Sequence, residues 1–362
     1  MTDLEKARQT INEIDGKMRQ LFLERMLSAK TVAEYKKLHG IQVFDPQREK
    51  EVIAKNSAAF PVDELKSYYV EFLTRNMEIS KQYQHRLLEG MKVAFSGVEG
   101  AFANIAANKV FPDATAVGYP DFKSAYNSVI NGECDCVILP IENSFNGDVG
   151  QVMDLTFFGP LYINGVYDIS VIQNLLANKG ADISGIKEVI SHPQAIGQCA
   201  EYIKKHGFKT TEAVNTAVAA KIVKECGRLD IAAIASDEAA EKYGLTKLEA
   251  HINQSSNNTT RFAVYSRTAK APSTADNHFI LLFTVTNEAG SLGKAISIIG
   301  ENGFNLKALK SRPTKDLIWN YYFFVEGEGN INSDKGKAML KDLREKCSDL
   351  RIVGNFEKEV IL

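Results

Sequence analysis

The sequence predicts a multidomain protein with an all-α module over residues 1–90, a two-lobed α/β region over 91–270 and a small α+β module over 276–362. Three changes of pattern support this division. Apolar residues recur at helical spacing in the first segment, and alternating strands and helices follow from Lys92 onward. A polar linker at 271–277 then precedes elements in the order β-α-β-β-α-β, which is typical of ferredoxin-like folds.

Composition narrows the class of protein. The 362 residues are 44% hydrophobic and 24% charged, and the formal net charge of −2 gives no reason to expect nucleic acid or an anionic membrane as a partner. No apolar run is long enough to span a bilayer, and the charged N-terminus lacks the apolar core of a secretory signal. The five cysteines, of which Cys134 and Cys136 are closest, lack zinc or redox spacing, so we expect a cytoplasmic protein with reduced thiols.

The first module is expected to contain three helices. An apolar stripe at alternating gaps of three and four predicts one long first helix: Leu4, Ala7, Ile11, Ile14, Met18 and Leu21. A turn at 38–40 ends it, and Asp45 with Pro46 forms a cap and first-turn pair for a second helix. Residues 60–63 begin a third helix that runs to about Leu88.

Two arginines lie on or beside the apolar stripe. For Arg8 or Arg25 alone, the simpler interpretation is a side chain whose charged head reaches water. The two are 17 positions apart, which is roughly 25 Å along a helix. If both bind one small dianion, a second copy of the chain must supply one of them, so we expect the module to dimerise through its first helix.

The α/β region opens with a strand at 92–95, a glycine turn at 97–100 and a helix at 101–109. Such a turn lets backbone approach an anion at a helix N-terminus. Dinucleotide spacing is absent, and a turn that serves only packing explains the glycines equally well.

A weak repeat predicts the two lobes of this region. Helices at 122–130 and 216–226 each lead through a glycine and an acidic residue to an apolar strand, at 135–139 and 230–234. Alternating strands and helices predict mainly parallel sheets, which bind ligands at the carboxyl ends of their strands. We expect the chain to cross between lobes near 168–170 and to return near 248–260.

Polar residues follow several of these strands and are candidates for a cleft between the lobes: Glu142, Asn143, Ser144, Ser191, His192 and Thr260. Each has a structural alternative. Residues 142–144 suit a turn or cap, Ser191-His192-Pro193 suits a helix start, and Thr260 could be an ordinary strand hydroxyl.

A polar stretch from Asn257 runs into a strand that begins with Thr260, Arg261 and Phe262. A hydroxyl beside a guanidinium places a proton donor next to a carboxylate binder. That combination suits a small anionic substrate.

The last module is expected to contain four strands and two helices, in chain order at 278–286, 291–301 (helix), 305–311, 317–326, 334–346 (helix) and 351–361. No acid, base and nucleophile cluster within it. The residues of this module therefore give no indication of a third catalytic site.

The helical module resembles the helical chorismate mutase family at eight positions: Arg8, Arg25, Lys36, Asp45, Arg48, Glu49, Ser80 and Gln84. The resemblance implies a dimeric enzyme that rearranges chorismate to prephenate. Arg8 of the partner subunit and Arg25 would clamp the two carboxylates, Lys36 and Gln84 would act on the breaking ether bond, and the other four would orient the substrate. Two of those four have simpler roles open to them, Asp45 as a helix cap and Glu49 as a surface charge.

The α/β region resembles the prephenate dehydratases through three motifs, Glu-Asn-Ser-x-x-Gly-x-Val over 142–149, Ser-His-Pro-Gln ending at Gln194, and Thr-Arg-Phe over 260–262. The resemblance implies a fold like that of periplasmic binding proteins and conversion of prephenate to phenylpyruvate, with no cofactor and no metal. Thr260 would be the proton donor, and Arg261 or a nearby cleft group would bind the carboxylate. Relatives carry a hydroxyl residue where this chain has Ala103-Asn104, and Asn104 is the candidate replacement.

The last module resembles the ACT domains of these dehydratases at two signatures, which with Asn305 give the expected phenylalanine-binding residues: Gly290, Ser291, Leu292, Asn305, Ser311, Arg312 and Pro313. The alternative is a helix-opening glycine turn and a proline strand end. Ser291 and Lys310 stand where relatives often have Ala and Glu.

Taken together, the chain resembles the bifunctional chorismate mutase–prephenate dehydratases, which implies phenylalanine biosynthesis, feedback inhibition by phenylalanine and at least a homodimer. A non-catalytic two-lobed sensor is the alternative, because such clefts also bind small molecules without chemistry. A second anion site on helices argues against a pure sensor.

Overall fold

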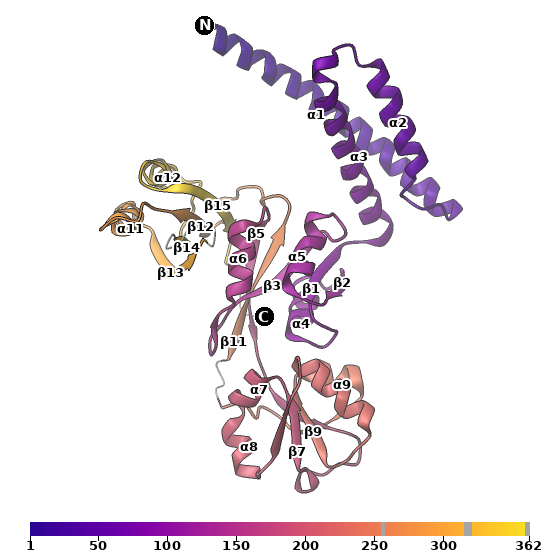
Figure 1. The fold of residues 1–362 in the computed structure, drawn as a ribbon, viewed down its shortest axis with the longest axis vertical. Coiled ribbons are helices and arrows are strands. Elements are labelled where there is room, and N and C mark those ends of the chain that lie inside the picture. The colour runs from indigo at the N-terminus through magenta and orange to yellow at the C-terminus, as the bar shows by residue number, and fades with distance from the viewer. Residues whose placement is uncertain (255–257, 315–320, 359–362) are drawn as a thin grey trace. The chain divides into compact units, whose positions relative to one another are not determined.

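The computed structural model describes residues 1–254, 258–314 and 321–358. The chain divides into two compact units, residues 1–92 and 93–362 (Figure 1). Within the described ranges, no helix is both long and apolar enough to cross a membrane. Those same ranges contain no cluster of three or more His, Cys, Asp or Glu side chains that could hold a metal ion.

The first unit contains the three predicted helices, α1 (Asp3–His39), α2 (Pro46–Ala59) and α3 (Lys66–Glu89). Thr2 and Glu5 form a capping box at the start of α1. The Asp45 carboxylate accepts a hydrogen bond from the Arg48 amide at 2.9 Å, so its predicted role as a cap is confirmed. A short 3₁₀ turn at Asp63–Leu65 precedes α3, which therefore begins later than predicted.

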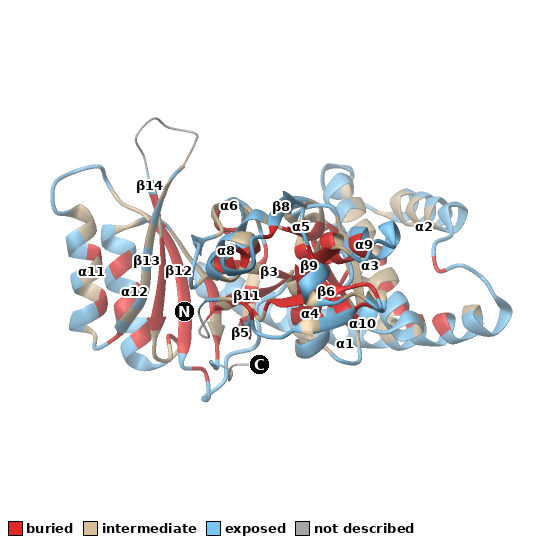
Figure 2. Ribbon diagram, turned by 90° about the horizontal axis from the view of Figure 1, so that it is seen from below, coloured by how far each residue is buried: buried red, intermediate tan, exposed pale blue. Residues whose placement is uncertain are grey.

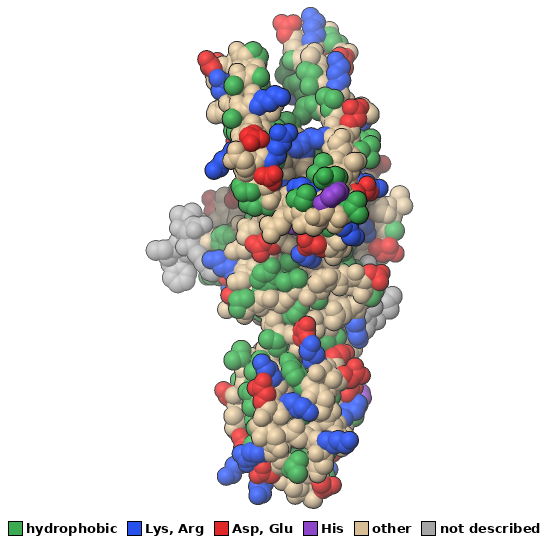
Figure 3. All heavy atoms as spheres, turned by 90° about the vertical axis from the view of Figure 1, so that its right-hand side faces the viewer, with side chains coloured by type: hydrophobic (Ala, Val, Ile, Leu, Met, Phe, Trp, Pro, Cys, Tyr) green, Lys and Arg blue, Asp and Glu red, His purple; other side chains and the backbone are tan. Residues whose placement is uncertain are grey.

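The predicted apolar stripe of α1 is exposed and is not buried against α2 or α3. Leu4, Ile11, Ile14 and Met18 are exposed, and Leu21 is 63% exposed. Figure 2 shows most of α1 and α2 as exposed, and Figure 3 shows hydrophobic side chains on the surface of this unit. A contiguous exposed apolar face of this kind marks an interaction surface.

The first lobe of the second unit is built on one sheet. Its strands are β1 (Lys92–Ser96), β2 (Thr115–Tyr119), β3 (Cys136–Asn143), β5 (Tyr162–Ser170) and β11 (Thr259–Ser266), in the order β5-β11-β3-β1-β2, with the short β4 (Gly147–Asp148) on β3. Its helices are α4 (Phe102–Val110), α5 (Phe122–Ile130) and α6 (Gly150–Phe158).

The second lobe has its own sheet. The strands are β6 (Asn174–Ala177), β7 (Glu188–Ser191), β8 (Lys209–Glu212), β9 (Ile231–Ala235) and β10 (Thr246–Glu249), in the order β10-β6-β9-β7-β8. The helices are α7 (Pro193–Gln198), α8 (Ala200–His206), α9 (Thr216–Cys226) and α10 (Asp237–Tyr243), with a 3₁₀ turn at Ile183–Gly185.

The chain crosses between the lobes where predicted, from β5 to β6, and returns from β10 to β11. The prediction of mainly parallel sheets is wrong, because β11 is antiparallel to both β3 and β5, and β6 is antiparallel to both β9 and β10. The strands that carry the chain out and back lie side by side and therefore run in opposite directions. Parallel pairing remains between β1 and β3 and between β7 and both β8 and β9.

Asn257, where the predicted polar stretch before β11 begins, lies outside the described residues.

The last module has the predicted ferredoxin-like order. Its elements are β12 (His278–Thr284), α11 (Ser291–Glu301), β13 (Asn305–Pro313), β14 (Tyr321–Glu328), α12 (Asp334–Lys346) and β15 (Ser348–Phe356). Its strands lie in the order β13-β14-β12-β15, with antiparallel neighbours. The predicted strand start at residue 317 and strand end at residue 361 fall outside the described residues.

This module is not separate from the first lobe. Strand β15 pairs with β5 at Gly354 and Ile163, which joins the two sheets into one. Residues from both, including Met153 of α6 and Tyr322 of β14, form a single hydrophobic core. The sequence predicted a linker followed by a separate module, but the first lobe and this module share one hydrophobic core.

The junction makes Gly354 a test of this arrangement. A Cβ at Gly354 would lie 3.1 Å from the Ile163 carbonyl oxygen and 3.3 Å from the Ile163 Cβ. Gly354→Val should therefore lower the free energy of unfolding by about 1–3 kcal/mol through overpacking, measured as a lower midpoint in thermal unfolding. Gly293→Ala is the control, because an added Cβ there meets no described atom within 4 Å. Equal midpoints for the two variants would contradict the tight junction.

Candidate active sites

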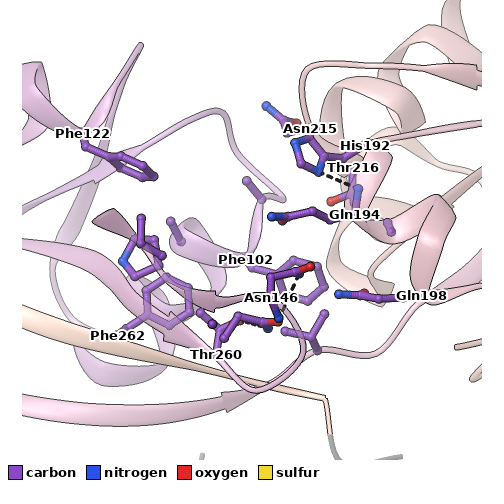
Figure 4. Close-up of a pocket in the computed structure, with 18 of the residues that line it drawn as sticks. Phe102, Phe122, Asn146, His192, Gln194, Gln198, Asn215, Thr216, Thr260 and Phe262 are labelled. Atoms are coloured by element: carbon purple, nitrogen blue, oxygen red, sulfur yellow. Dashed lines mark hydrogen bonds between the residues drawn. The ribbon is translucent and has the colours of Figure 1, made fainter. Parts of the chain in front are cut away.

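A cavity of about 540 Å³ lies between the two lobes of the second unit. Five of the residues predicted from sequence line it: Asn143, His192, Gln194, Thr260 and Phe262. Figure 4 shows Thr260 and Phe262 on one wall and His192, Gln194, Asn215 and Thr216 on the facing wall. The strand ends of both lobes therefore contribute to one site.

The Thr260 hydroxyl is held by the amide of Asn143. Asn143 Nδ2 donates to Thr260 Oγ1 at 2.9 Å, while Asn143 Oδ1 accepts from the amides of Phe145 and Asn146, each at 3.0 Å. These two backbone donors fix the orientation of the Asn143 amide. Because the Asn143 bond uses an acceptor position of the hydroxyl, Thr260 keeps its own proton for donation to a third group.

His192 is the cap of α7. Its Nδ1 accepts a hydrogen bond from the Gln194 amide at 3.2 Å, so the proton of the neutral ring lies on Nε2. Burial lowers the pKa of His192 below its ordinary value, against an opposing charge effect of Glu212. The imidazole is therefore neutral near pH 7.

Four helices begin at this cavity. The sequence predicts helix starts one by one but does not indicate that they meet at one site. Residues in the first turns or caps of α4, α6, α7 and α9 line it: Ala101, Phe102, Gly150, Gln151, Gln194, Asn215 and Thr216. Neither α4 nor α6 has a side-chain cap. Their first-turn amides, with the positive ends of the helix dipoles, are suited to bind carboxylates. No lysine or arginine is among the described residues that line the cavity.

Several predicted cleft residues have structural partners instead. Ser191 is fully buried and donates to the Ile234 carbonyl at 2.6 Å. Ser144 Oγ accepts from the Thr259 amide at 3.0 Å. Asn104, the candidate replacement for a substrate-binding hydroxyl, accepts from the Gly100 amide at 3.0 Å and does not line the cavity.

Arg261 or a nearby cleft group was expected to bind a substrate carboxylate, but the Arg261 side chain is on the other face of β11. Strand alternation turns Thr260 and Phe262 toward the cavity and Arg261 away from it. The guanidinium contacts three carboxylates: Glu326 at 2.6 and 2.9 Å, Glu142 at 3.2 Å and Asp168 at 3.5 Å. Burial alone would lower the pKa of Arg261, but Glu326 and the other carboxylates raise it above its ordinary value.

In the helical unit, Arg25 and Ser80 connect α1 to α3. Arg25 Nη1 donates to Ser80 Oγ and, at 3.1 Å, to the Asn76 carbonyl. Burial lowers the pKa of Arg25. Gln84 is buried on the same face of α3 as Ser80, and its Oε1 has no hydrogen-bond partner among the described residues.

The other predicted residues of this unit are spread along it. Lys36 Nζ donates to the Val43 carbonyl at 2.6 Å, and Arg48 lies 3.7 Å from Glu51. Glu49 pairs with Lys81 at 2.7 Å. A second cavity of about 580 Å³ between α1 and α3 is lined by Arg25 but not by the exposed Arg8.

The predicted effector residues lie at the start of α11 and along β13. Gly290 has a positive φ of 84° as the cap of α11, and Ser291 Oγ lies 3.0 Å from Thr286 Oγ1. Leu292 is half-buried, whereas Ser311 and Pro313 are exposed. Asn305 Nδ2 donates to Glu328 at 2.9 Å, and Arg312 binds Asp154 of α6.

The lowered pKa of His192 predicts a pH effect on stability. The unfolded chain takes up this proton near the ordinary pKa of 6.5, whereas the folded protein does so only at lower pH. The free energy of unfolding should therefore decline as pH falls below about 6.5. His192→Asn retains a capping side chain but cannot titrate. Urea unfolding at about pH 7.5 and about 5.5 should show a smaller decline in the variant, and equal declines would contradict this assignment.

Comparisons with known proteins match both units of the chain. A chorismate mutase type II family model matches residues 7–85, and a prephenate dehydratase model matches residues 93–270. A bifunctional chorismate mutase/prephenate dehydratase from Buchnera aphidicola is 30% identical, over 98% of this chain and 96% of its own length.

Two solved structures share the fold of the second unit. Prephenate dehydratase from Arthrobacter aurescens, in complex with L-Phe, has a TM-score of 0.69 and 25% identity over 75% of this chain and 93% of its own. GqqA, described as a quorum-quenching acylase, has a TM-score of 0.69 and 28% identity over 74% of this chain and 98% of its own. The full-length match and the two family models lead to one conclusion: the chain belongs to the bifunctional chorismate mutase/prephenate dehydratase family.

Proposed function

We propose that residues 1–90 rearrange chorismate to prephenate, that residues 91–270 convert prephenate to phenylpyruvate, and that residues 276–362 form an ACT domain that senses phenylalanine. The observation that carries the dehydratase assignment is the Thr260 hydroxyl, held by Asn143 in a cavity where four helices begin. A prephenate dianion would find hydrogen-bond donors there without a cationic side chain.

In the dehydratase step, prephenate loses carbon dioxide and its ring hydroxyl. The carbon–carbon bond to the departing carboxylate breaks, its electron pair completes the aromatic ring, and the hydroxyl leaves as water with one proton that comes from the solvent. Thr260 donates a hydrogen bond to that hydroxyl, while Asn143 fixes the position of Thr260 Oγ1. Phe102, Phe122 and Phe262 supply the apolar part of the cavity for the ring (Figure 4).

Two titratable residues near the motifs, Glu142 and His192, form no hydrogen bond with the Thr260 hydroxyl, whose partner is Asn143. Glu142 contacts Arg261 and Lys310, each at 3.2 Å, so its carboxylate is engaged away from the hydroxyl. His192 lies on the facing wall. Because a threonine hydroxyl is a poor acid in water, we assign Thr260 mainly to hydrogen-bond donation in the transition state. The acylase description of GqqA raises acyl transfer as an alternative reaction. It is less favoured, because a nucleophilic hydroxyl needs a neighbouring base, and the Thr260 hydroxyl is held by the Asn143 amide.

In the mutase site, Arg25 binds one substrate carboxylate and Arg8 of the partner subunit binds the other. Two features support this assignment: the roughly 25 Å between these positions on one helix and the exposed stripe of α1. Lys36 and Gln84 act on the breaking ether bond, and Asp45, Arg48, Glu49 and Ser80 orient the substrate. The unpartnered Oε1 of Gln84 leaves that amide able to reorient toward a ligand.

Phenylalanine is the proposed effector, and the site comprises Gly290, Ser291, Leu292, Asn305, Ser311 and Pro313. Arg312, which was also predicted to bind it, is engaged by Asp154 instead. Support comes from the ferredoxin-like topology and from the relative solved with L-Phe. The ligand must bind two states of the enzyme with different affinity to inhibit it. Deletion of residues 276–362 would expose the shared core, so point variants test this site better.

Thr260→Val should lower dehydratase kcat by about 10²–10⁴ with little change in KM, because the swap removes the hydroxyl and keeps the β-branched shape. Steady-state kinetics on prephenate would measure this. Thr259→Val is the matched control, since the neighbouring side chain does not line the cavity. A Thr260→Val enzyme within about tenfold of wild type would remove Thr260 from the chemistry.

Arg8→Ala and Arg25→Ala should each abolish mutase activity, and mixing the two variants should restore part of it. In a mixed dimer, one site holds both arginines and the other holds neither. Chorismate turnover after confirmed subunit exchange is the measurement, and dehydratase activity on supplied prephenate should persist throughout. Absence of rescue would contradict the shared site.

A further inference from the structure

One short segment connects the cleft to the ferredoxin-like module. Residues 147–151, which include β4 and the first two residues of α6, all line the cavity. Two basic side chains of β13, Lys310 and Arg312, contact this segment and its continuation from the opposite side. They flank Ser311, a predicted effector residue.

Lys310 bridges two carboxylates of the β3–β4 hairpin, of which Asp148 lines the cavity and Glu142 also contacts Arg261. Glu142 and Asp148 are cross-strand partners in the β3–β4 hairpin, an arrangement that is destabilising for two carboxylates. Lys310 Nζ lies 2.6 Å from Asp148 and 3.2 Å from Glu142, and its side chain is only 12% exposed. The next residue, Asn143, pairs with Gly147 and holds the Thr260 hydroxyl.

Arg312 holds the other end of the segment. Its guanidinium binds Asp154 through two hydrogen bonds, of 2.7 and 3.1 Å, and Tyr322 donates to the same carboxylate at 3.1 Å. The guanidinium also occupies the space that a Cβ at Gly150 would need. A side chain at position 150 would therefore displace the Arg312 guanidinium from the first turn of α6.

The far end of α6 is fixed by the same module. Arg351 donates to the carbonyls of Phe157 and Gly159 at 2.8 and 2.9 Å, and the Phe157 ring stacks on Tyr322. A helix whose first turn lines the cavity thus takes its position from β13, β14 and β15. A shift of β13 would move the wall of the cavity.

We propose that Lys310 is a positioning residue for the dehydratase, and that Lys310 and Arg312 together make the geometry at Asn143 and Thr260 depend on the state of β13. This inference rests on the proposed dehydratase function and effector site. Lys310 touches no substrate; it acts by keeping Glu142 and Asp148 together, and hence the hairpin closed. An effector bound at Ser311 would change the cavity through these two side chains.

The test is kinetic and uses the full chain. Lys310→Met should lower dehydratase kcat by about tenfold, a size typical of residues that couple two sites, with a smaller change in KM. It should also weaken the maximal inhibition by phenylalanine, while mutase activity stays at the wild-type level. Lys310→Arg should restore most of kcat, because it returns the positive charge. Lys310→Glu should be worse than Lys310→Met, since three carboxylates would then meet.

Lys307→Met is the matched control, because Lys307 is on the same strand and pairs with Glu328 at 2.9 Å, away from the cavity. In a double-mutant cycle with Asp148→Asn, the effects of Lys310→Met should not add. If Lys310→Met and Lys307→Met gave equal kcat and equal phenylalanine inhibition, the proposal would be overturned. Inactivity of the wild-type enzyme on prephenate would instead overturn the proposed function.

Discussion

The structure of the second unit depends on the cluster of charges around Arg261. Glu326 is 2% exposed, and a carboxylate at that depth is stable only when it is paired and hydrogen-bonded. Arg261 supplies both of its oxygens with a donor and also contacts Glu142 and Asp168. One guanidinium thus connects β11 to β3, to the crossing strand β5 and to β14. Removal of Arg261 would leave Glu326 buried without its pair.

This cluster also determines which side chains reach the cavity. With Arg261 turned toward β14, alternation along β11 presents Thr260 and Phe262 to the substrate. Together with the core shared by α6 and β14, it makes the ferredoxin-like module a structural part of the dehydratase. A regulatory ligand would therefore act on contacts that already support the active site.

The sequence predicted best what depends on local pattern. The bounds of α5, α9, α11 and α12 and the cap at Asp45 follow from apolar periodicity and from capping residues next to one another in the chain. Partner choice between distant strands leaves no such local signal. The mixed sheets and the β5–β15 junction were therefore missed. Arg261 was misplaced because a motif records residue order, whereas strand alternation decides which face each side chain occupies.

The sequence also predicted only in part that several helices begin at one cavity. Absence of a capping side chain before Phe102 and Gly150 is visible in the sequence, but it becomes informative only once both helices are known to start at one cavity. No sequence pattern indicated that the carboxylate of Glu326 is buried. An acidic residue in an otherwise apolar strand can equally face solvent, and only the position of Arg261 decides between the two.

The two proposed sites bind dianions by different means, and the chemistry of each step explains why. The mutase rearrangement keeps both carboxylates, so an arginine clamp stabilises substrate and transition state alike, and preferential stabilisation must come from groups at the ether bond. The dehydratase reaction discharges one carboxylate as neutral carbon dioxide. A lysine or arginine held against that group would stabilise the substrate more than the transition state and would slow the reaction. A cavity whose donors are helix amides, carboxamides, one imidazole and the hydroxyls of Thr216 and Thr260, with no lysine or arginine among its described lining residues, binds the anion while placing no full positive charge against the bond that breaks.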